Sequence, residues 1–280
     1  MTRPGALLIV GTPIGNLGDL SARGIETLST VDAIACEDTR RTGLLLKHIG
    51  APKRTLIVIN EHTEFDAAAN VIGRMLQGER VALVSDAGMP LVSDPGERLV
   101  SAAIEAGCEV DVVPGPTALS TALVLSGLDS RRFVFEGFLP RKGPDRATVL
   151  ADIAASSRTV VCYESPHRVA KTLADLAAVC GDERRVAVAR ELTKLHQEVW
   201  RGTLAGGAAH FAETGARGEF VLVIAATSAE IAEVTDTDLA AALQVHLDDG
   251  LSVRDATAEV VEHFGVAKRR VYAIATELRS

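Results

Sequence analysis

Short apolar runs alternate with longer amphipathic stretches along most of the chain. The first half has apolar runs of strand length at residues 6–10, 31–36, 55–59, 81–84 and 110–113. Stretches with helical spacing separate them, at residues 21–29, 39–49, 65–76 and 97–106. Strands that alternate with helices predict an α/β domain with a mainly parallel sheet.

The rhythm changes at Pro114-Gly-Pro116, which reads as a hinge into a second α/β half. Strands are predicted there at residues 133–138, 159–163, 186–189 and 220–225. Helices are predicted at residues 117–125, 145–155 and 169–179. The chain therefore divides into an N-terminal α/β domain over 1–115 and a C-terminal α/β domain over 116–228.

A polar connector over 226–238 leads to a helical segment, assigned to 235–280, with helices at 253–263 and 267–278. Their short junction indicates a helix-turn-helix-like arrangement, and a basic cluster, Lys268 to Arg270, begins the second helix. Two interpretations stay open here. The segment binds nucleic acid, or it is a helical cap on the core.

Composition narrows the class of protein. Hydrophobic residues make up 47% of the 280 positions, aromatic residues only 4%, and the net charge is −8. An acidic chain is unsuited to broad phosphate binding, although a local basic patch remains compatible with it. The four cysteines form no Cys-x-x-Cys pair, no apolar run is long enough to cross a membrane, and the first residues lack a signal sequence. These features predict a cytoplasmic protein.

Several glycine- and proline-rich loops follow predicted strands, where α/β folds place ligands. They are Gly11 to Gly18, Ser85 to Gly96, Pro114 to Ala118, and Tyr163 to Arg168. The first loop matches neither the dinucleotide fingerprint nor a phosphate-binding P-loop. Each loop is either a structural turn, with Asp86, Asp94 or Ser165 capping a helix, or part of a ligand site. The length and rigidity of the second loop favour a ligand site.

Two charged clusters also follow strands, at residues 37–41 and 190–194. Each is an ion-pair network or part of a site. His62 between Glu61 and Glu64 lacks partners at metal-ligand spacing, so no metal is expected. No Gly-x-Ser-x-Gly motif anchors a hydrolase triad. The residues alone thus indicate a small-molecule cleft without naming its ligand.

Seven motifs in order resemble the signature of the ribosomal RNA small subunit methyltransferase I family. They are Thr12 to Asp19, Glu37 to Arg40, Ser85 to Gly88 with Ser93 to Gly96, Glu136 to Pro140, Tyr163 to Arg168, Arg190 to Lys194, and Gly218 to Ile224. The likeness covers about residues 6 to 225, and the helical tail is also similar. Met89 and Thr63 depart from the pattern, and neither change removes a charge.

The resemblance implies a tetrapyrrole-methylase-like fold, in which S-adenosylmethionine lies in a cleft between two α/β domains. It implies an enzyme, a 2′-O-methyltransferase of a cytidine ribose in 16S rRNA within the small ribosomal subunit, and a homodimer. The cofactor contacts that it implies are Pro13, Asp86, Ala87, Gly88, Leu91, Thr117, Ala118, Tyr163, Glu164, Leu192, Glu219 and Phe220.

Ribose methylation needs a group that accepts the hydroxyl proton, and carboxylates at strand ends are the candidates. We expect Asp38 or Glu37 in this role, and then Glu61. Arg40 or Lys194 would stabilise developing negative charge or hold a phosphate.

Two rival functions remain. A C-methyltransferase of tetrapyrrole precursors would share the fold but carry Gly-Gly-Asp-Pro where this chain has Ser85-Asp-Ala-Gly88. A ligand-sensing regulator would bind nucleic acid through the helical tail, whose small basic cluster offers few phosphate contacts.

Overall fold

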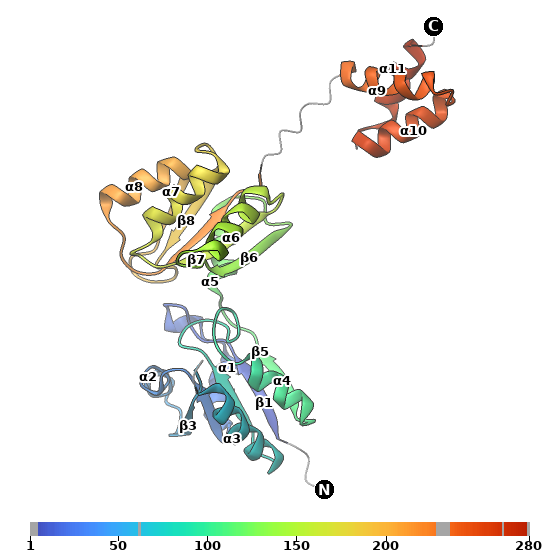
Figure 1. Ribbon diagram of the computed structural model, residues 1–280. Helices are drawn as coiled ribbons and strands as arrows, with labels where there is room; N and C mark the ends of the chain where they lie inside the picture. The colour runs from blue at the N-terminus through green and yellow to red at the C-terminus, as the bar shows by residue number, and fades with distance from the viewer. Residues whose placement is uncertain (1–4, 61–62, 228–235, 265, 279–280) are drawn as a thin grey trace. The chain divides into compact units, whose positions relative to one another are not determined.

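The computed structural model describes residues 5–60, 63–227, 236–264 and 266–278. The chain falls into two compact units that divide after residue 227. The first unit carries two β-sheets with helices on their faces, and the second is helical (Figure 1). No helix in the described parts of the chain combines the length and apolar character that crossing a bilayer requires.

The first sheet has five strands in the order β3-β2-β4-β1-β5, and every pairing in it is parallel. Its strands are β1 (Ala6–Val10), β2 (Ala33–Cys36), β3 (Thr55–Val58), β4 (Val81–Val84) and β5 (Glu109–Val113). All strands and helices predicted for this half are present, within two residues at most ends. Because the strands are parallel, the loops after β1, β2, β4 and β5 meet at one edge of the sheet.

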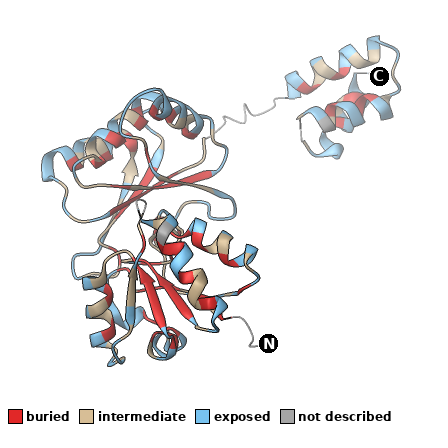
Figure 2. Ribbon diagram, turned by 60° about the horizontal axis from the view of Figure 1, so that its bottom comes forward, coloured by how far each residue is buried: buried red, intermediate tan, exposed pale blue. Residues whose placement is uncertain are grey.

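Alternating side chains divide this sheet into two apolar layers. Leu7, Ala35 and Leu83 face α3 (Glu64–Leu76) and α4 (Glu97–Glu105). Leu8 and Ile34 face the other side. That side is covered by α1 (Ala22–Thr30) and α2 (Thr39–His48). Figure 2 shows the strands as the buried centre of the layers. The central strands β1, β2 and β4 have both faces covered and are apolar throughout, which explains why they could be recognised from the sequence. The edge strands β3 and β5 are more exposed.

The second sheet has the order β6-β7-β10-β8-β9 and is mixed. Only β6 and β7 pair in parallel, and the other neighbours are antiparallel. Its strands are β6 (Phe133–Phe138), β7 (Thr159–Glu164), β8 (Arg185–Arg190), β9 (Glu198–Thr203) and β10 (Phe220–Ile224). One face packs on α5 (Ala118–Ser126), the other on α6 (Pro144–Ala155), α7 (Val169–Cys180) and α8 (Leu204–Thr214).

Strand β9 and helix α8 do not appear in the sequence-based assignment. Both contain glycine and polar residues that break the usual patterns. The structure gives a reason for the glycines of α8, because a Cβ on Gly207 would lie 3.0 Å from the Trp200 ring of β9. Small residues on the helix therefore make room for the indole, and packing rather than propensity selects them.

The second unit contains α9 (Asp236–Asp248), α10 (Val253–Phe264) and α11 (Lys268–Glu277). The helices share a small core that includes Leu239, Leu243, Val260 and Val271. The two helices predicted at the end of the chain are present. The connector expected over 226–238 is wrong at its end, because α9 already begins at Asp236.

The domain boundaries predicted from the sequence, at residues 115 and 228, stay predictions. The first sheet ends at Val113, and the next helix begins at Ala118, capped by the Thr117 hydroxyl. Both sheets nevertheless belong to one compact unit. Part of the reason is Ile14, a residue of the first loop that is buried in the apolar cluster of the second sheet.

Candidate functional site

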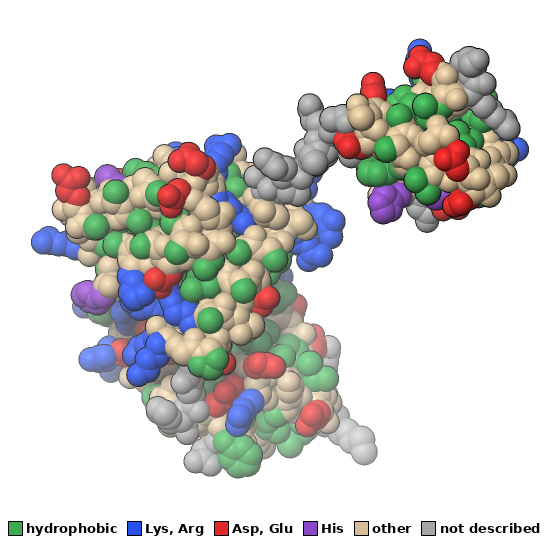
Figure 3. Space-filling view, turned by 45° about the horizontal axis from the view of Figure 1, so that its top comes forward, with side chains coloured by type: hydrophobic (Ala, Val, Ile, Leu, Met, Phe, Trp, Pro, Cys, Tyr) green, Lys and Arg blue, Asp and Glu red, His purple; other side chains and the backbone are tan. Residues whose placement is uncertain are grey.

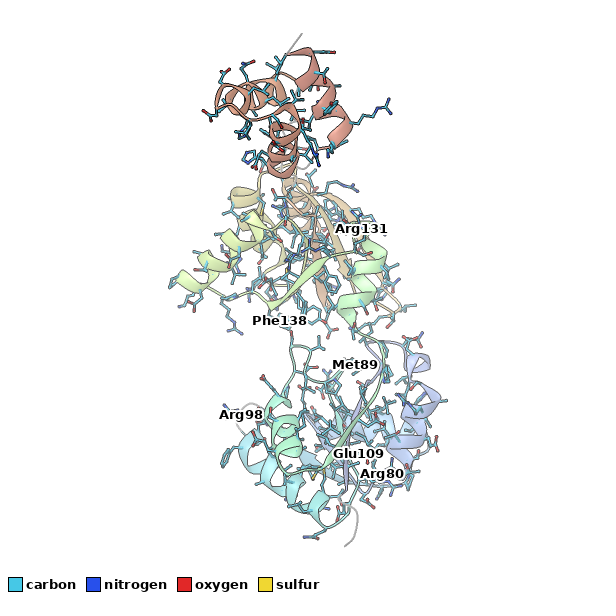
Figure 4. All side chains as sticks on the ribbon, turned by 90° about the vertical axis from the view of Figure 1, so that its right-hand side faces the viewer. Arg80, Met89, Arg98, Glu109, Arg131 and Phe138 are labelled. Atoms are coloured by element: carbon cyan, nitrogen blue, oxygen red, sulfur yellow. The ribbon has the colours of Figure 1, made fainter. Side chains whose placement is uncertain are left out.

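A cavity of about 370 Å³ opens between the two sheets of the first unit. That volume lies in the range of small-molecule sites. Met89, in the loop after β4, and Phe138, the last residue of β6, line it from the facing ends of the sheets (Figure 4). Its other lining residues are Ile14, Arg41, Asp86, Ala87, Gly88, Val92, Ser93, Asp94, Thr117, Ala118, Tyr163, Glu164, Ser165, Pro166, Leu192, Gly218, Glu219, Phe220 and Val221.

Backbone contacts join the first, second and third loops. Thr12 and Gly88 form an isolated antiparallel bridge, with N–H···O distances of 2.8 and 3.1 Å. The Thr12 hydroxyl also donates to the carbonyls of Ser85 and Gly88. Gly11 packs directly on Gly115, because a Cβ on Gly11 would lie 2.6 Å from the Gly115 Cα. Only a chain without side chains can approach another backbone so closely.

Replacing Gly11 with alanine is expected to force these loops apart. The added methyl would overlap Gly115 and the Met89 sulfur, each at 2.6 Å. Overpacking of this kind costs about 1–3 kcal/mol in the free energy of unfolding. Chemical denaturation measures that loss, and Gly43→Ala is the matched control, because a Cβ there meets nothing within 4 Å. Equal stability of the two variants would contradict the proposed loop contact.

Among the described residues, four non-glycine residues have left-handed backbone, and all lie in two loops beside the cavity. They are Leu91 (φ 71°) and Ser93 (φ 67°) in the second loop, and Glu191 (φ 49°) and Thr193 (φ 63°) after β8. Such conformations cost free energy and persist only where the surroundings hold them. Because these costly conformations occur together beside the cavity, we infer that the two loops serve ligand binding at the expense of stability.

Three carboxyl groups lie together at the first-sheet side of the cavity. Glu37 Oε1 accepts a hydrogen bond from the Asp86 N–H at 3.3 Å. Burial raises the pKa of Glu37 to about 7, and the negative charge of Asp94 adds to the rise. Burial also raises the pKa of Asp94. Arg41 offsets part of the charge through an ion pair with Asp86 at 3.4 Å.

Neither Asp86 nor Asp94 caps helix α4. Its first N–H groups instead donate to Glu64 Oε1, with N···O distances of 3.2 Å from Gly96 and 3.0 Å from Arg98. One oxygen of Asp86, Oδ1, is buried without a hydrogen-bond partner among the described residues. A buried acceptor without a donor is costly in a finished core and typical of a site that receives a ligand.

Asp38 differs from its neighbour Glu37. Its carboxylate caps α2 by accepting from the Arg40 N–H at 2.8 Å. It also accepts from the Arg40 guanidinium at 3.0 and 2.6 Å. These bonds hold the pKa of Asp38 well below its usual range, which makes it a poor proton acceptor. Neither residue lines the cavity.

Replacing Asp38 with asparagine is expected to leave turnover within about threefold of the parent, because asparagine caps helices as well as aspartate does. Initial rates at saturating cofactor measure the effect, and circular dichroism checks the fold. A loss of a hundredfold or more with an intact fold would restore Asp38 as the proton acceptor.

Lys194 is held by two carboxylates at the second-sheet side. Its ammonium donates to Glu191 at 2.8 Å and to Glu219 at 3.0 Å. Burial lowers the pKa of Lys194, but these hydrogen bonds outweigh it and raise the pKa. Gly218 packs on the Glu191 side chain, and Glu219 lines the cavity. The lysine therefore organises this loop and has little freedom to reach a substrate phosphate.

An aromatic group forms the floor on the second-sheet side. The Tyr163 ring meets Phe135 and Phe138 edge-on, at centroid distances of 4.9 and 5.5 Å. The Tyr163 hydroxyl accepts from the Leu119 N–H of α5 at 3.3 Å. Burial raises the pKa of Tyr163, so the hydroxyl stays neutral. This floor is apolar and rigid.

A buried ionic network holds this floor from behind. The Glu164 side chain is fully buried and accepts from the Thr172 hydroxyl and the Ser165 N–H, each at 2.7 Å. It also pairs with Arg168 at 3.3 Å. Arg168 donates to the Leu139 carbonyl, and Arg146 donates to the Pro140 carbonyl and to Thr172. The network thus ties the loop after β7 to the segment after Phe138.

The cavity gathers most residues expected at the cofactor. Asp86, Ala87, Gly88, Thr117, Ala118, Tyr163, Glu164, Leu192, Glu219 and Phe220 line it. Pro13 lines a neighbouring cavity, and Leu91 lines neither. Of the expected catalytic residues, Asp38, Arg40 and Lys194 are engaged in ion pairs, and Glu37 lies behind Asp86. Glu61 lies outside the described residues.

Sequence reasoning did not assign several lining residues to the cofactor, although they lie within loops, charged clusters or motifs that it did recognise. They include Ile14, Arg41, Met89, Asp94, Phe138 and Gly218. Motif position was the available signal for them, but the direction of each side chain is set by tertiary packing. Within the described ranges, no three His, Cys, Asp or Glu side chains are grouped as a metal ion requires.

Comparison with known proteins identifies the family. Residues 6–206 match the tetrapyrrole (corrin/porphyrin) methylases, and residues 233–279 match the RsmI C-terminal HTH domain. A Synechocystis sp. protein named ribosomal RNA small subunit methyltransferase I is 44% identical over 99% of both chains. The chain belongs to the ribosomal RNA small subunit methyltransferase I family.

Other members of the ribosomal RNA small subunit methyltransferase I family agree in extent. The Xylella fastidiosa protein is 46% identical over 97% of this chain and 99% of its own. The Escherichia coli O157:H7 protein is 42% identical over 98% of this chain and 95% of its own. The Thermotoga maritima protein is 45% identical over 79% of this chain, yet that match covers 98% of its own length. That relative has no room for a segment of the size of the second unit.

Solved structures agree on the fold. Uroporphyrin III C-methyl transferase from Thermus thermophilus aligns with a TM-score of 0.58 at 18% identity, over 82% of this chain and 100% of that one. The methyltransferase CobJ aligns with a TM-score of 0.62 at 20% identity, over 80% and 95%. The Thermus enzyme was also solved in complex with S-adenyl homocysteine, and that structure aligns with a TM-score of 0.57.

Proposed function

We propose that this chain transfers a methyl group from S-adenosylmethionine to the 2′-oxygen of a cytidine ribose in 16S rRNA of the small ribosomal subunit. The observation that carries the proposal is the likeness to the Synechocystis protein, which extends over 99% of both chains. That protein is named ribosomal RNA small subunit methyltransferase I. The site supports it independently through its cavity, its charge and its candidate proton acceptor.

The cavity fits the cofactor in size and in charge. A volume of about 370 Å³ with apolar walls suits a nucleoside with an attached amino acid. Asp86 and Asp94 line it, and only Arg41 adds a positive side chain to its lining. The acidic excess suits a sulfonium cation, and the Thr12–Gly88 bridge and Tyr163 hold the walls. S-adenosylmethionine supplies an electrophilic methyl group when it is bound.

The chain would contribute positioning and proton transfer. We propose that Glu37 accepts the proton of the ribose hydroxyl. Its pKa is about 7, so at neutral pH about half of the molecules carry the carboxylate that can accept a proton. Asp38 is the weaker choice, because Arg40 occupies both of its oxygens. Rigid loops around the cavity would hold the reacting groups in line.

The helical unit contributes little positive charge to RNA binding. Residues 233–279 carry nine acidic side chains against five basic ones. One of the basic residues, Arg270, pairs with Asp236 at 2.7 Å. Figure 3 shows Lys and Arg gathered on the first unit, whereas the face of the helical unit in view shows few of them. We therefore place the RNA contact mainly on the first unit. We further propose that the protein acts in the cytoplasm and as a homodimer.

A methyl-transfer assay tests the proposal. The full chain and radiolabelled S-adenosylmethionine are incubated with small ribosomal subunits that lack native ribose methylation, with free 16S rRNA and a tetrapyrrole precursor in parallel. We expect label on the subunit at a cytidine 2′-oxygen. Label on the tetrapyrrole alone would overturn the substrate and keep the fold, and cofactor binding without any transfer would favour a sensing role.

A further inference from the structure

A second cavity of about 240 Å³ adjoins the first one. It is lined by Thr12, Pro13, Leu17, Arg41, Thr42, Leu44, Leu45, Ser85 and Asp86, and is called the side cavity below. Arg41 and Asp86 line both cavities, so the two meet at this ion pair. A molecule in the side cavity would therefore lie directly beside a cofactor in the first.

Arg41 is the cation at the junction that remains available. Its side chain is 62% exposed, and its ion pair with Asp86 is long, at 3.4 Å. Arg40 next to it is held by Asp38 at 2.6 Å, and Lys194 by two carboxylates. A guanidinium with most of its donors free is suited to a phosphate oxygen.

Apart from Arg41, Asp86 and the buried hydroxyl residues Thr12, Thr42 and Ser85, the lining is apolar, and part of it faces solvent. Leu44 on α2 is 68% exposed, and Leu17, in the short 3₁₀ helix Leu17–Asp19, is 46% exposed. Pro13 adds a further apolar surface. Leucines that line an open cavity offer flat contacts to a planar ring, as apolar side chains do for extruded bases.

The charge of the lining selects among ligands. Among the described residues that line the side cavity, Arg41 is the one basic side chain and Asp86 the one acidic side chain, so there is room for at most one further anionic group on Arg41. A tetrapyrrole precursor carries several carboxylates and would leave most of them without a cation. A nucleotide of an RNA chain carries one phosphate and a planar base, which match Arg41 and the exposed leucines.

We propose that the side cavity receives the target nucleotide of the RNA, with its base against Leu17 and Leu44 and its phosphate on Arg41. This inference rests on the proposed function and deepens it. The ribose would then lie at the junction, beside Asp86, whose N–H donates to Glu37. The methyl donor would then lie next to the sugar, and Glu37, which lines neither cavity, would accept the proton from the side of Asp86.

The test compares a double variant with a matched control. Leu17→Ala combined with Leu44→Ala removes the apolar walls, while Ile104→Ala on α4 removes a side chain of similar exposure, 62%, outside both cavities. We expect the double variant to raise KM for small subunits by roughly tenfold. Its dissociation constant for S-adenosylhomocysteine, measured by calorimetry, and its thermal midpoint should match those of the control.

Arg41→Gln adds a second readout. Losing one phosphate contact is expected to reduce the slope of log Kd for the subunit against log salt by about one. A double variant with the KM of the parent, or an Arg41→Gln variant with an unchanged slope, would overturn the proposed site.

Subunit binding in the presence of S-adenosylhomocysteine separates this inference from the function itself. A parent protein that binds subunits but transfers no methyl group would overturn the function, and the variants would still report on the cavity through Kd. Normal transfer with unchanged binding by both variants would overturn the cavity alone. A parent that neither binds nor methylates subunits would overturn both.

Discussion

Replacing Glu37 with glutamine is expected to lower turnover by about 10²–10⁴-fold, the usual range for losing a positioned proton acceptor. Glutamine is nearly the same size, and its carbonyl oxygen still accepts from the Asp86 N–H, so the loop should keep its shape. Cofactor affinity, measured by calorimetry, should change little. Glu26→Gln, an exposed position on α1, controls for the loss of one negative charge.

The pH dependence gives the same prediction a second readout. Since burial raises the pKa of Glu37 to about 7, only the carboxylate present above that pH accepts a proton. The parent's kcat/KM should rise up to about pH 7 and then level off, and the residual activity of Glu37→Gln should lack this rise. An unchanged rate and profile would move the role elsewhere, with Asp94 as the next candidate.

The raised pKa also has a consequence for stability. The folded chain holds a proton on Glu37 that the unfolded chain releases near its ordinary pKa of 4.5. The stabilising contribution of this protonation is therefore complete below about pH 4.5 and is lost as pH rises through about 7. Glu37→Gln should accordingly be at least as stable as the parent at pH 8. Glu37 thus weakens the fold under the conditions in which it would serve the reaction.

Removing the Glu164 side chain is the change expected to cost the most stability. Glu164→Ala would leave Arg168, the Thr172 hydroxyl and the Ser165 N–H without their acceptor in a buried place. Breaking a buried ion pair on one side costs about 3 kcal/mol or more. Urea denaturation measures the free energy of unfolding, and the cofactor dissociation constant should rise as the Tyr163 floor loosens.

Glu198→Ala is the matched control for that experiment. Glu198 pairs with Arg190 at 3.3 Å, the same distance as Glu164 and Arg168, but the Glu198 side chain is 45% exposed. An exposed pair contributes less than about 1 kcal/mol. If the two variants lost the same free energy of unfolding, burial would not be the reason why the Glu164 network stabilises the fold.

The sequence predicted the central strands β1, β2 and β4 well because they are covered on both faces and are therefore apolar. The edge strands β3 and β5 are more exposed, but each still carries a short apolar run. Strand β9 and helix α8 were not predicted, because their glycines make room for the Trp200 ring and interrupt the hydrophobic pattern of a strand or helix. Helix α9 was not predicted, and its first three residues were assigned to the connector, because it has acidic residues in its first turn and only two fully buried leucines among its described residues. Local pattern thus fails where tertiary contacts decide the residue type.

Much of the site could be predicted because motif loops follow strand ends, where ligands bind. Ten of the expected cofactor residues line the first cavity. Roles within the loops were harder to predict. Glu37 and Asp38 are adjacent and chemically alike, yet one is buried beside Asp94 and the other is bound by Arg40. Burial and partners set these roles, and a sequence alone does not place them.

Because of the left-handed residues beside the cavity, the loops of the site become ordered when the chain folds and not when a ligand binds. Holding Leu91, Ser93, Glu191 and Thr193 in unfavourable conformations costs free energy during folding, before any ligand arrives. Loops that are already fixed lose little further entropy on binding, so more of the contact energy remains as affinity. A glycine at any of these positions would adopt the left-handed conformation without strain. It would also make the loop more flexible, so the loop would lose conformational entropy when the ligand binds. The protein thus gives up some stability in exchange for a receptor that needs no rearrangement.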